Sequence, residues 1–263
     1  MALSIGVDVG GTKIAAGVVD DDGKVLQTIR RDSPAFSRQA IIDTITTVVH
    51  RLREDFPDVA TVGIGAAGFV SSDRNTMAHG TNLDWTGMRI GDVVSEGVGL
   101  PVVVENDANA FGWAEARFGA ARGKRNALIV AIGTGVGGAI IVDGHLLRGW
   151  LGLTGEVGHM PVEPEGLKCR CGRRGCWETR SGLQALTSIY PPGDAVRDET
   201  TSLDERIEIL RQRFDAGDTE LTRRLELSQQ ALTRALAILE DVLNPQVIVL
   251  SGYLAAFADV FLS

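Results

Sequence analysis

A chain of 263 residues, 44% of them hydrophobic, is long enough to bury a sizeable core and too apolar to be disordered. Its net charge of −8 argues against nucleic acid and anionic membranes as partners, because both repel an acidic surface. The sequence has no apolar run long enough to span a bilayer, and its first residues lack the basic start and apolar stretch of a signal peptide. We therefore expect a cytoplasmic protein.

The first half begins with three strand-like runs, at about residues 3–9, 13–20 and 24–31. A Gly-rich turn follows the first run, and an Asp-Gly turn at Asp20–Gly23 joins the last two. Apolar residues at helical spacing predict a helix over 37–55. The segment "ATVGIGAAG" reads as a buried strand, and "LPVVVENDANAFGWAEARFGAA" predicts a strand that becomes a helix near Asn106 or Asp107.

The same order of parts returns in "NALIVAIGTGVGGAIIVDGHLLRG", as strand, Gly-Thr turn, strand, Asp-Gly turn and strand. Two such units more than a hundred residues apart predict duplicated α/β halves, which we place at 1–108 and 109–263. Helices are expected at about 181–190, 203–216 and 219–243, with a polar loop at 191–202. The segment "PQVIVLSG" predicts one further strand that enters a glycine turn.

Two Gly-rich turns, "DVGGTK" and "GTGVGG", each separate two strands. Glycines let a phosphate approach the backbone N–H groups, and Thr12, Thr134 and Lys13 add donors. Either turn alone could be a tight hairpin without a ligand, since neither matches the P-loop or dinucleotide spacing. Their duplication favours a paired phosphate grip of the kind found in actin-like kinases. Asp8, at the end of the first strand, could hold a magnesium-bound water.

An acidic turn, "ENDANA", places Glu105, Asn106 and Asp107 at the carboxyl end of a strand, where ligands gather in α/β sheets. Phosphoryl transfer to an alcohol needs a carboxylate that accepts the hydroxyl proton, and Asp107 is our candidate. A plain helix cap is the alternative, because Asp and Asn are common at that position.

All three cysteines lie within eight positions in "CRCGRRGC", and His159 lies ten residues before the first of them. Three thiolates and one imidazole complete a tetrahedral zinc site of the closed, structural kind. The predicted ligands are His159, Cys169, Cys171 and Cys176. Unpartnered thiols are the alternative. Glu156 and Glu178 flank this cluster, and a metal-stiffened loop that presents carboxylates suits a polyol, whose hydroxyls need fixed acceptors.

Taken together, "DVGGTK", "NLDW", "ENDANA", "GTGVGG", "GEVGH" and "CRCGRRGCWE" resemble the ROK family, which holds bacterial sugar kinases and sugar-responsive repressors. The motifs appear in the family's order over nearly the whole chain, and the early half is most similar to actinobacterial glucokinases. The resemblance implies an α/β, actin-like (ribonuclease H-like) fold of two domains, with sugar and ATP meeting in a central cleft. It further implies ATP-dependent phosphorylation of glucose with magnesium, a structural zinc, and a homo-oligomer, either dimer or tetramer.

The resemblance also implies roles for particular residues. Asp107 would be the general base on the 6-hydroxyl of the sugar. The implied sugar contacts are Asn82, Asn106, Asp107, Glu156, His159 and Glu178. The implied nucleotide and magnesium contacts are Asp8, Gly10, Gly11, Thr12, Lys13, Gly133, Thr134, Gly135, Gly137 and Gly252.

Two features depart from the family pattern. The turn after the last predicted strand reads "SGYLAAF" in place of a triple glycine, so Tyr253 would stand close to adenosine and weaken ATP binding. The sequence ends at Ser263, before the late helices usual in the family. A non-catalytic sugar-sensing regulator is the main alternative, although the first strand begins too early for a helix-turn-helix. Fructose, mannose, allose or an N-acetylhexosamine could replace glucose, and polyphosphate could replace ATP.

Overall fold

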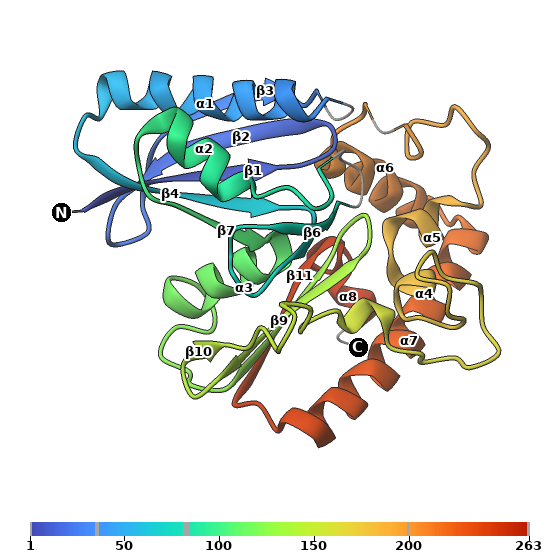
Figure 1. Ribbon diagram of the computed structural model, residues 1–263. Helices are drawn as coiled ribbons and strands as arrows, with labels where there is room; N and C mark the ends of the chain where they lie inside the picture. The colour runs from blue at the N-terminus through green and yellow to red at the C-terminus, as the bar shows by residue number, and fades with distance from the viewer. Residues whose placement is uncertain (1, 35–36, 81–84, 199, 262–263) are drawn as a thin grey trace. The chain divides into compact units, whose positions relative to one another are not determined.

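The computed structural model describes residues 2–34, 37–80, 85–198 and 200–261, which form two compact units (Figure 1). The first unit comprises residues 1–119 and 148–154, and the second comprises residues 120–147 and 155–263. The boundary that we predicted after residue 108 differs from this division, which keeps the helix at 107–117 in the first unit. The chain therefore passes between the units more than once.

The first unit is a five-stranded sheet with helices on both faces. Its elements are β1 (Leu3–Val9), β2 (Lys13–Val19), β3 (Val25–Asp32), α1 (Arg38–Asp55), β4 (Val59–Ala66), β5 (Gly68–Val70), β6 (Met77–Gly80), α2 (Ile90–Val98), β7 (Val102–Asn106) and α3 (Asp107–Arg117). The strand order is β3-β2-β1-β4-β7, and β5 and β6 pair separately. β1, β2 and β3 form an antiparallel meander, whereas β4 and β7 run parallel to β1.

The core of this unit lies between the sheet and the helix α1. Six apolar residues of α1 are buried, and they are the residues whose spacing predicted the helix: Ile41, Ile42, Ile45, Val48, Val49 and Leu52. All of them except Ile42 belong to one buried cluster with the inward-facing residues of β1, which alternate with outward ones as a pleated strand requires. The opposite face is built with glycines, and Gly65 of β4 lies against Ala110 of α3. The start of α3 can therefore approach the sheet closely.

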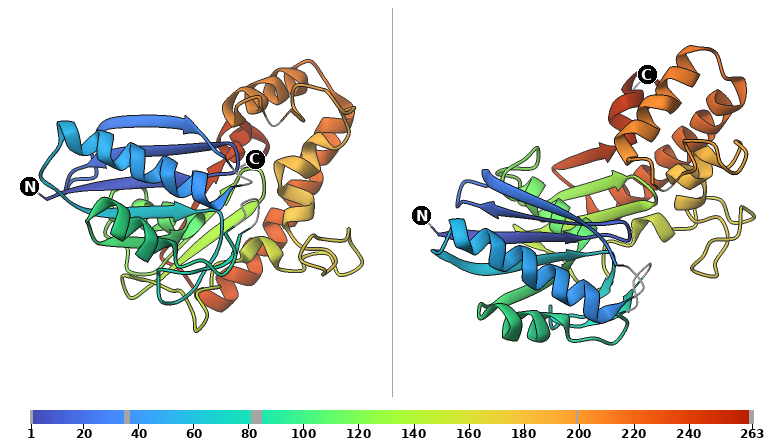
Figure 2. Two further views of the ribbon diagram at one scale, coloured as in Figure 1. Left: turned by 45° about the horizontal axis from the view of Figure 1, so that its top comes forward. Right: turned by 90° about the horizontal axis from the view of Figure 1, so that it is seen from above.

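The second unit repeats this plan with more helices after it (Figure 2). Its elements are β8 (Ala127–Ile132), β9 (Val136–Val142), β10 (His145–Leu146), the 3₁₀ helix η1 (Val157–His159), α4 (Glu178–Ser181), α5 (Leu183–Thr187), α6 (Leu203–Asp215), α7 (Thr219–Leu243), β11 (Val247–Gly252), the 3₁₀ helix η2 (Tyr253–Phe257) and α8 (Ala258–Phe261). The order β10-β9-β8-β11 has the same antiparallel meander and parallel neighbour as β3-β2-β1-β4. The predicted duplication is therefore visible in the sheets.

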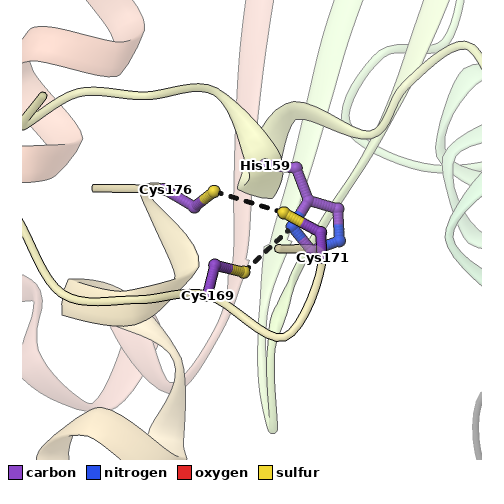
Figure 3. A group of neighbouring side chains, drawn as sticks. All are labelled: His159, Cys169, Cys171 and Cys176. Carbon is purple, nitrogen blue, oxygen red and sulfur yellow. Dashed lines mark hydrogen bonds between the residues drawn. The ribbon is translucent and has the colours of Figure 1, made fainter. Parts of the chain in front are cut away.

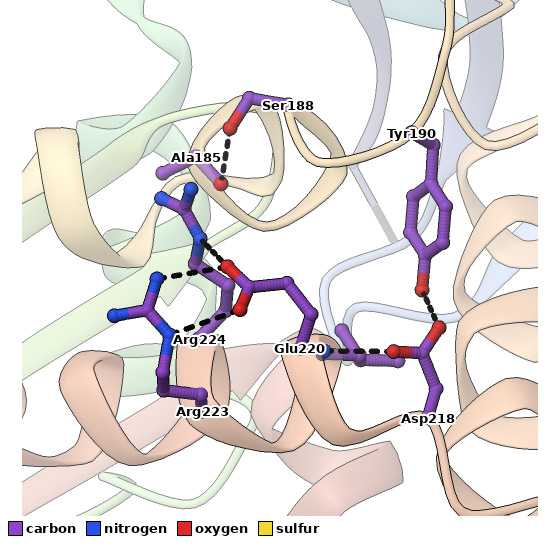
Figure 4. A network of polar contacts seen from close by, with 8 residues as sticks. Ala185, Ser188, Tyr190, Asp218, Glu220, Arg223 and Arg224 are labelled. Atoms are coloured by element: carbon purple, nitrogen blue, oxygen red, sulfur yellow. Dashed lines mark hydrogen bonds and ion pairs between the residues drawn. The ribbon is translucent and has the colours of Figure 1, made fainter.

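One predicted helix is wrong in its bounds. The segment expected to be helical over 181–190 forms two short helices, α4 and α5, because Gly182 adopts an extended conformation with φ −64° and ψ 146°. By contrast, α7 forms over the full predicted range and begins at a well-made cap. The carboxylate of Asp218 accepts hydrogen bonds from the Leu221 backbone N–H at 3.0 Å and the Tyr190 hydroxyl at 2.8 Å (Figure 4).

Candidate functional site

The turn between β7 and α3 carries the predicted general base. Asn106 ends the strand with φ −60° and ψ 142°, and its side-chain oxygen accepts a hydrogen bond from the Asn109 backbone N–H at 3.0 Å. Asn106 is thus the N-cap of α3, and Asp107 is the first helical residue. The predicted change from strand to helix is confirmed at this position, and the carboxylate stands at the carboxyl end of a parallel strand.

The Asp107 carboxylate is held through one of its two oxygens. Its Oδ1 accepts hydrogen bonds from the Ala108 backbone N–H at 2.9 Å and from Asn106 Nδ2 at 3.1 Å. The side chain keeps a solvent-exposed surface, so the packing around it desolvates it only in part. This desolvation raises the pKa of Asp107, the charge of Asp8 raises it further, and the Ala108 bond opposes the shift. A carboxylate of raised pKa is a better proton acceptor.

The first Gly-rich turn connects β1 to β2 as predicted. The Gly10 backbone N–H donates to the Lys13 carbonyl at 3.0 Å, which closes a tight turn, and Thr12 and Lys13 are exposed on it. Asp8 lies just before this turn, on β1 between Ala15 of β2 and Gly65 of β4. Desolvation raises the pKa of Asp8, whereas the charge of Lys13 lowers it. Asp8 is close enough to Asp107 for their charges to interact.

The second Gly-rich turn connects β8 to β9. The Gly133 backbone N–H donates to the Gly135 carbonyl at 3.0 Å. Glu178, the first residue of α4, reaches back to this turn and accepts a hydrogen bond from the Val136 backbone N–H at 3.2 Å. A predicted sugar contact and a predicted phosphate turn therefore lie side by side in the second unit.

The four predicted zinc ligands converge (Figure 3). Their ligand atoms all lie within 4.8 Å of one another, and the sulfurs of Cys171 and Cys176 are 3.6 Å apart. Two sulfurs bound to one tetrahedral zinc lie about 3.8 Å apart, because each Zn–S bond is about 2.3 Å long. Burial would raise the pKa of Cys171, but hydrogen bonds from Arg173 outweigh it and lower the pKa to about 7, whereas burial raises the pKa of Cys176 to about 12, so Cys171 is the readier thiolate of the two. The donor set and its spacing fit zinc.

The ring of His159 faces two ways. Its Nδ1 lies 3.5 Å from the Cys169 sulfur, on the side of the cluster, while Nε2 lies 4.0 Å from Glu156 Oε2. Between these residues, Gly158 packs so closely on the Val136 carbonyl that any side chain there would collide with it. Val136 thus contacts Gly158 through its carbonyl and Glu178 through its N–H, which brings η1 and α4 to the same end of β9.

The turn at the end of β11 departs from its prediction. Gly252 has φ +86°, and a side chain on it would collide with the Ile132 carbonyl, so only glycine fits. Tyr253, however, does not stand in an exposed turn. It is 1% exposed, and its hydroxyl donates to the Ser181 carbonyl at 2.8 Å and lies 2.9 Å from the Ser228 hydroxyl. The expectation that its bulk projects towards adenosine is wrong, because the ring fills the core of the second unit.

One residue of the turn at Asp107 had no predicted role. Glu105 binds Arg148 with an Nε–Oε2 distance of 2.7 Å, and Arg74 approaches the same oxygen at 3.6 Å. The sequence offers no local signal for these partners, which lie 43 and 31 positions away from Glu105.

Of the predicted sugar contacts, Asn82 lies outside the described residues. Among the described residues, no helix combines the length and apolarity needed to cross a membrane.

The chain is similar to proteins of known family and structure. The profile of the ROK family matches residues 4–262. A glucokinase of Streptomyces coelicolor is 43% identical over 210 residues, a match that covers 80% of this chain but only 64% of that protein. A glucokinase of Halalkalibacterium halodurans is 32% identical, with 98% of this chain and 82% of that protein covered. The structure of a ROK family glucokinase from Streptomyces griseus in complex with glucose and AMPPNP has a TM-score of 0.79 at 36% identity, covering 100% of this chain and 90% of that one.

Proposed function

This chain belongs to the ROK family and has its actin-like fold, and we propose that it transfers the terminal phosphoryl group of ATP to the 6-hydroxyl of glucose. The observation that carries the proposal is the turn at Asp107, which holds a carboxylate by one oxygen at the end of a parallel strand. The glucokinases among the relatives, one of them bound to glucose and an ATP analogue, support the choice of sugar and nucleotide.

Asp107 would act through its second oxygen. Both hydrogen bonds described above use Oδ1, so we assign Oδ2 to the proton of the sugar hydroxyl. As that proton is removed, the hydroxyl oxygen becomes the nucleophile that attacks the phosphorus. Asn106 fixes the carboxylate from the side, and its own Nδ2 also donates to the Gly68 carbonyl at 2.9 Å. Part of the capping alternative is therefore true, because Asn106 caps α3 while it orients the base.

The nucleotide would bind at the Gly-rich turns. In the proposal, backbone N–H groups of Gly10–Lys13 and Gly133–Gly137 receive the phosphates, Lys13 adds positive charge, and Gly252 lies near adenosine. Asp8 would hold magnesium through a water, and magnesium would neutralise charge on the phosphates. The pair of turns at equivalent positions of two duplicated sheets supports this assignment.

The sugar would also bind to the second unit. Glu156, His159 and Glu178 offer two carboxylates and one imidazole nitrogen to sugar hydroxyls, and Asn82 is assigned to the same sugar. Zinc held by His159, Cys169, Cys171 and Cys176 would be structural, because four protein ligands leave no open position for a substrate.

The test is a coupled assay of ADP release over a panel of sugars: glucose, fructose, mannose, allose and an N-acetylhexosamine. We expect the highest kcat/KM with glucose and ATP, and little turnover with polyphosphate. Asp107→Asn keeps the size and hydrogen bonds of the side chain but cannot accept the proton. It should lower kcat by about two to four orders of magnitude while glucose affinity changes little.

The acid limb of the pH–rate profile provides a second check on the base. Asp107 must be ionised to accept a proton, and its pKa is raised. As the pH is lowered, kcat should therefore begin to fall at a higher pH than an ordinary aspartate, with a pKa of about 3.9, would cause. Near-normal turnover by Asp107→Asn would contradict the assignment of the base. Tight glucose binding by the unmodified protein without phosphorylation of any sugar would favour the regulator instead.

A further inference from the structure

Glu105 has no role in the proposed chemistry, yet it stands two residues before the base. We propose that Glu105 is a positioning residue, and that its ion pair with Arg148 fixes the turn that presents Asp107. This inference rests on the proposed function for its kinetic consequence, but the fixing of the turn is a property of the first unit by itself.

The contacts of Glu105 divide between its two oxygens. Oε2 accepts the 2.7 Å bond from Arg148 Nε. Oε1 accepts a hydrogen bond from the Asn106 backbone N–H at 3.2 Å and another from Asn109 Nδ2 at 3.3 Å. One oxygen therefore faces a guanidinium, and the other holds the N-cap residue and the third residue of α3.

Two steps connect Glu105 to the reacting carboxylate. Asn109 is 2% exposed and donates its backbone N–H to the Asn106 side chain, whose Nδ2 in turn donates to Asp107 Oδ1. Asn106 and Asn109 thus each bond both to Glu105 and to each other. A shift of Glu105 would be passed to Asp107 through the cap, although Glu105 itself is not among the residues assigned to contact the substrate.

The charge of Glu105 explains why it needs arginine. Its side chain is only 13% exposed, and a carboxylate so far removed from water is costly unless it is paired. Arg74 supplies a second positive charge at 3.6 Å, and its carbonyl accepts a hydrogen bond from the Val104 backbone N–H at 2.9 Å, so it too is attached to β7. Arg148 belongs to the segment 148–154, which the chain inserts into the first unit between β10 and η1.

The kinetic test uses Arg148→Met, which removes the charge at nearly constant length, and Arg148→Lys, which keeps it. A misplacement of about 1 Å at a reacting group can cost about 100-fold in rate, so we expect Arg148→Met to lower kcat about 10- to 100-fold. The KM values for glucose and ATP should change less than about threefold, because no substrate contact is removed. Arg148→Lys should recover part of kcat. Glu105→Gln should reproduce the loss in kcat.

The second unit offers a matched control. Arg213 and Asp194 form an ion pair with an N–O distance of 2.9 Å, and the side chains are 29% and 16% exposed. The corresponding values for Arg148 and Glu105 are 29% and 13%. Arg213→Met should therefore cost similar stability while leaving kcat unchanged. Equal losses of kcat in Arg148→Met and Arg213→Met would show a general effect of stability and overturn the inference.

A readout independent of activity separates this inference from the proposed function. Hydrogen exchange at residues 107–110 should be faster in Arg148→Met than in the unmodified protein, and unchanged in Arg213→Met. If the unmodified protein phosphorylates no sugar, the proposed function fails and the exchange result alone decides the inference. Unchanged exchange at 107–110, or unchanged kcat in Arg148→Met, would overturn it. Should Glu105→Gln fail to fold, the Arg148 variants carry the test.

Discussion

The imidazole of His159 would contact both the zinc ion and the sugar. Its Nδ1 faces the cysteine sulfurs and its Nε2 faces Glu156, so a metal on the first nitrogen would set the direction of the second. The spacing of the cysteines predicted this convergence, because few residues separate them and the ligand types suit one metal. The ion pair between Glu105 and Arg148 had no such signal in the sequence. Arginine and glutamate pair in many places, and only the fold shows that Arg148 is the partner.

A substitution at the exposed ligand tests what the metal does for the sugar. Cys171→Ser should remove zinc at small cost to the core, since Cys171 lies at the surface. We expect glucose affinity to fall about tenfold or more, a size typical of lost support around a metal-bound histidine, while ATP affinity changes little. Metal content and titrations with both ligands on the same preparation would check this. Unchanged glucose affinity in a zinc-free sample would contradict it.

The sequence predicted helices and strands well where apolar residues recur at regular spacing. The buried positions of α1 were readable because every third or fourth residue is apolar. The break at Gly182 was not readable, since a glycine within an apolar segment can be helical or extended. Here the Gly182 backbone N–H closes the end of α4 by donating to the Glu178 carbonyl, and the Leu183 N–H then donates to the Gly133 carbonyl instead of continuing the helix. The prediction for Tyr253 was wrong for a related reason. Its sequence position suggested a turn, but its hydroxyl found buried partners on two helices.

The start of α7 offers a prediction for a single element. Asp218→Ala removes the cap and the bond from the Tyr190 hydroxyl, and should lower the free energy of unfolding by about 1–2 kcal/mol. Glu220, which pairs with Arg223 and Arg224 (Figure 4), is the contrast, and Glu220→Gln should cost much less than Asp218→Ala, because ion pairs of a solvent-exposed carboxylate contribute little to stability. Urea denaturation would measure both. Equal losses in the free energy of unfolding for the two variants would show that the cap stabilises α7 no more than a surface ion pair does.

The pH dependence of the same cap has a definite sign. The hydrogen bond from the Leu221 N–H, followed by the bond from Tyr190, lowers the pKa of Asp218 below that of an unfolded aspartate, despite opposing desolvation. Its stabilising contribution is therefore complete above about pH 3.9 and declines as the pH falls through the lower folded value. The difference in stability between the protein and Asp218→Ala should shrink under acid.

At the scale of the molecule, the described residues form two hydrophobic cores, one in each unit. The sequence predicted two duplicated halves because the strand and turn patterns repeat. The two compact units differ from these predicted halves, because the segment 148–154 packs in the first unit although its neighbours in the chain belong to the second. Order along the chain favours continuous domains, and nothing in residues 148–154 marks them as an insertion.

Separate cores predict a local response to metal removal. A chelator should speed hydrogen exchange in residues 160–178, where the metal would close the loop, because the binding energy of a structural zinc stabilises the fold around it. Exchange in residues 41–52, which lie in the core of the first unit, should not change. A chelated sample in which both regions exchange faster would show that the metal supports the entire chain.

The pairing of β8 with β11 has a consequence for synthesis on the ribosome. Ala127 lies opposite Val247, so 120 residues must be added before this sheet is complete, whereas Leu3 and Val59 of the first sheet are 56 residues apart. At about 5–20 residues per second, the edge of β8 waits on the order of ten seconds for its partner. Leu128 and Val130 of that strand are fully buried in the finished fold. During elongation their strand is an open, apolar edge on which a chaperone or another nascent chain can act.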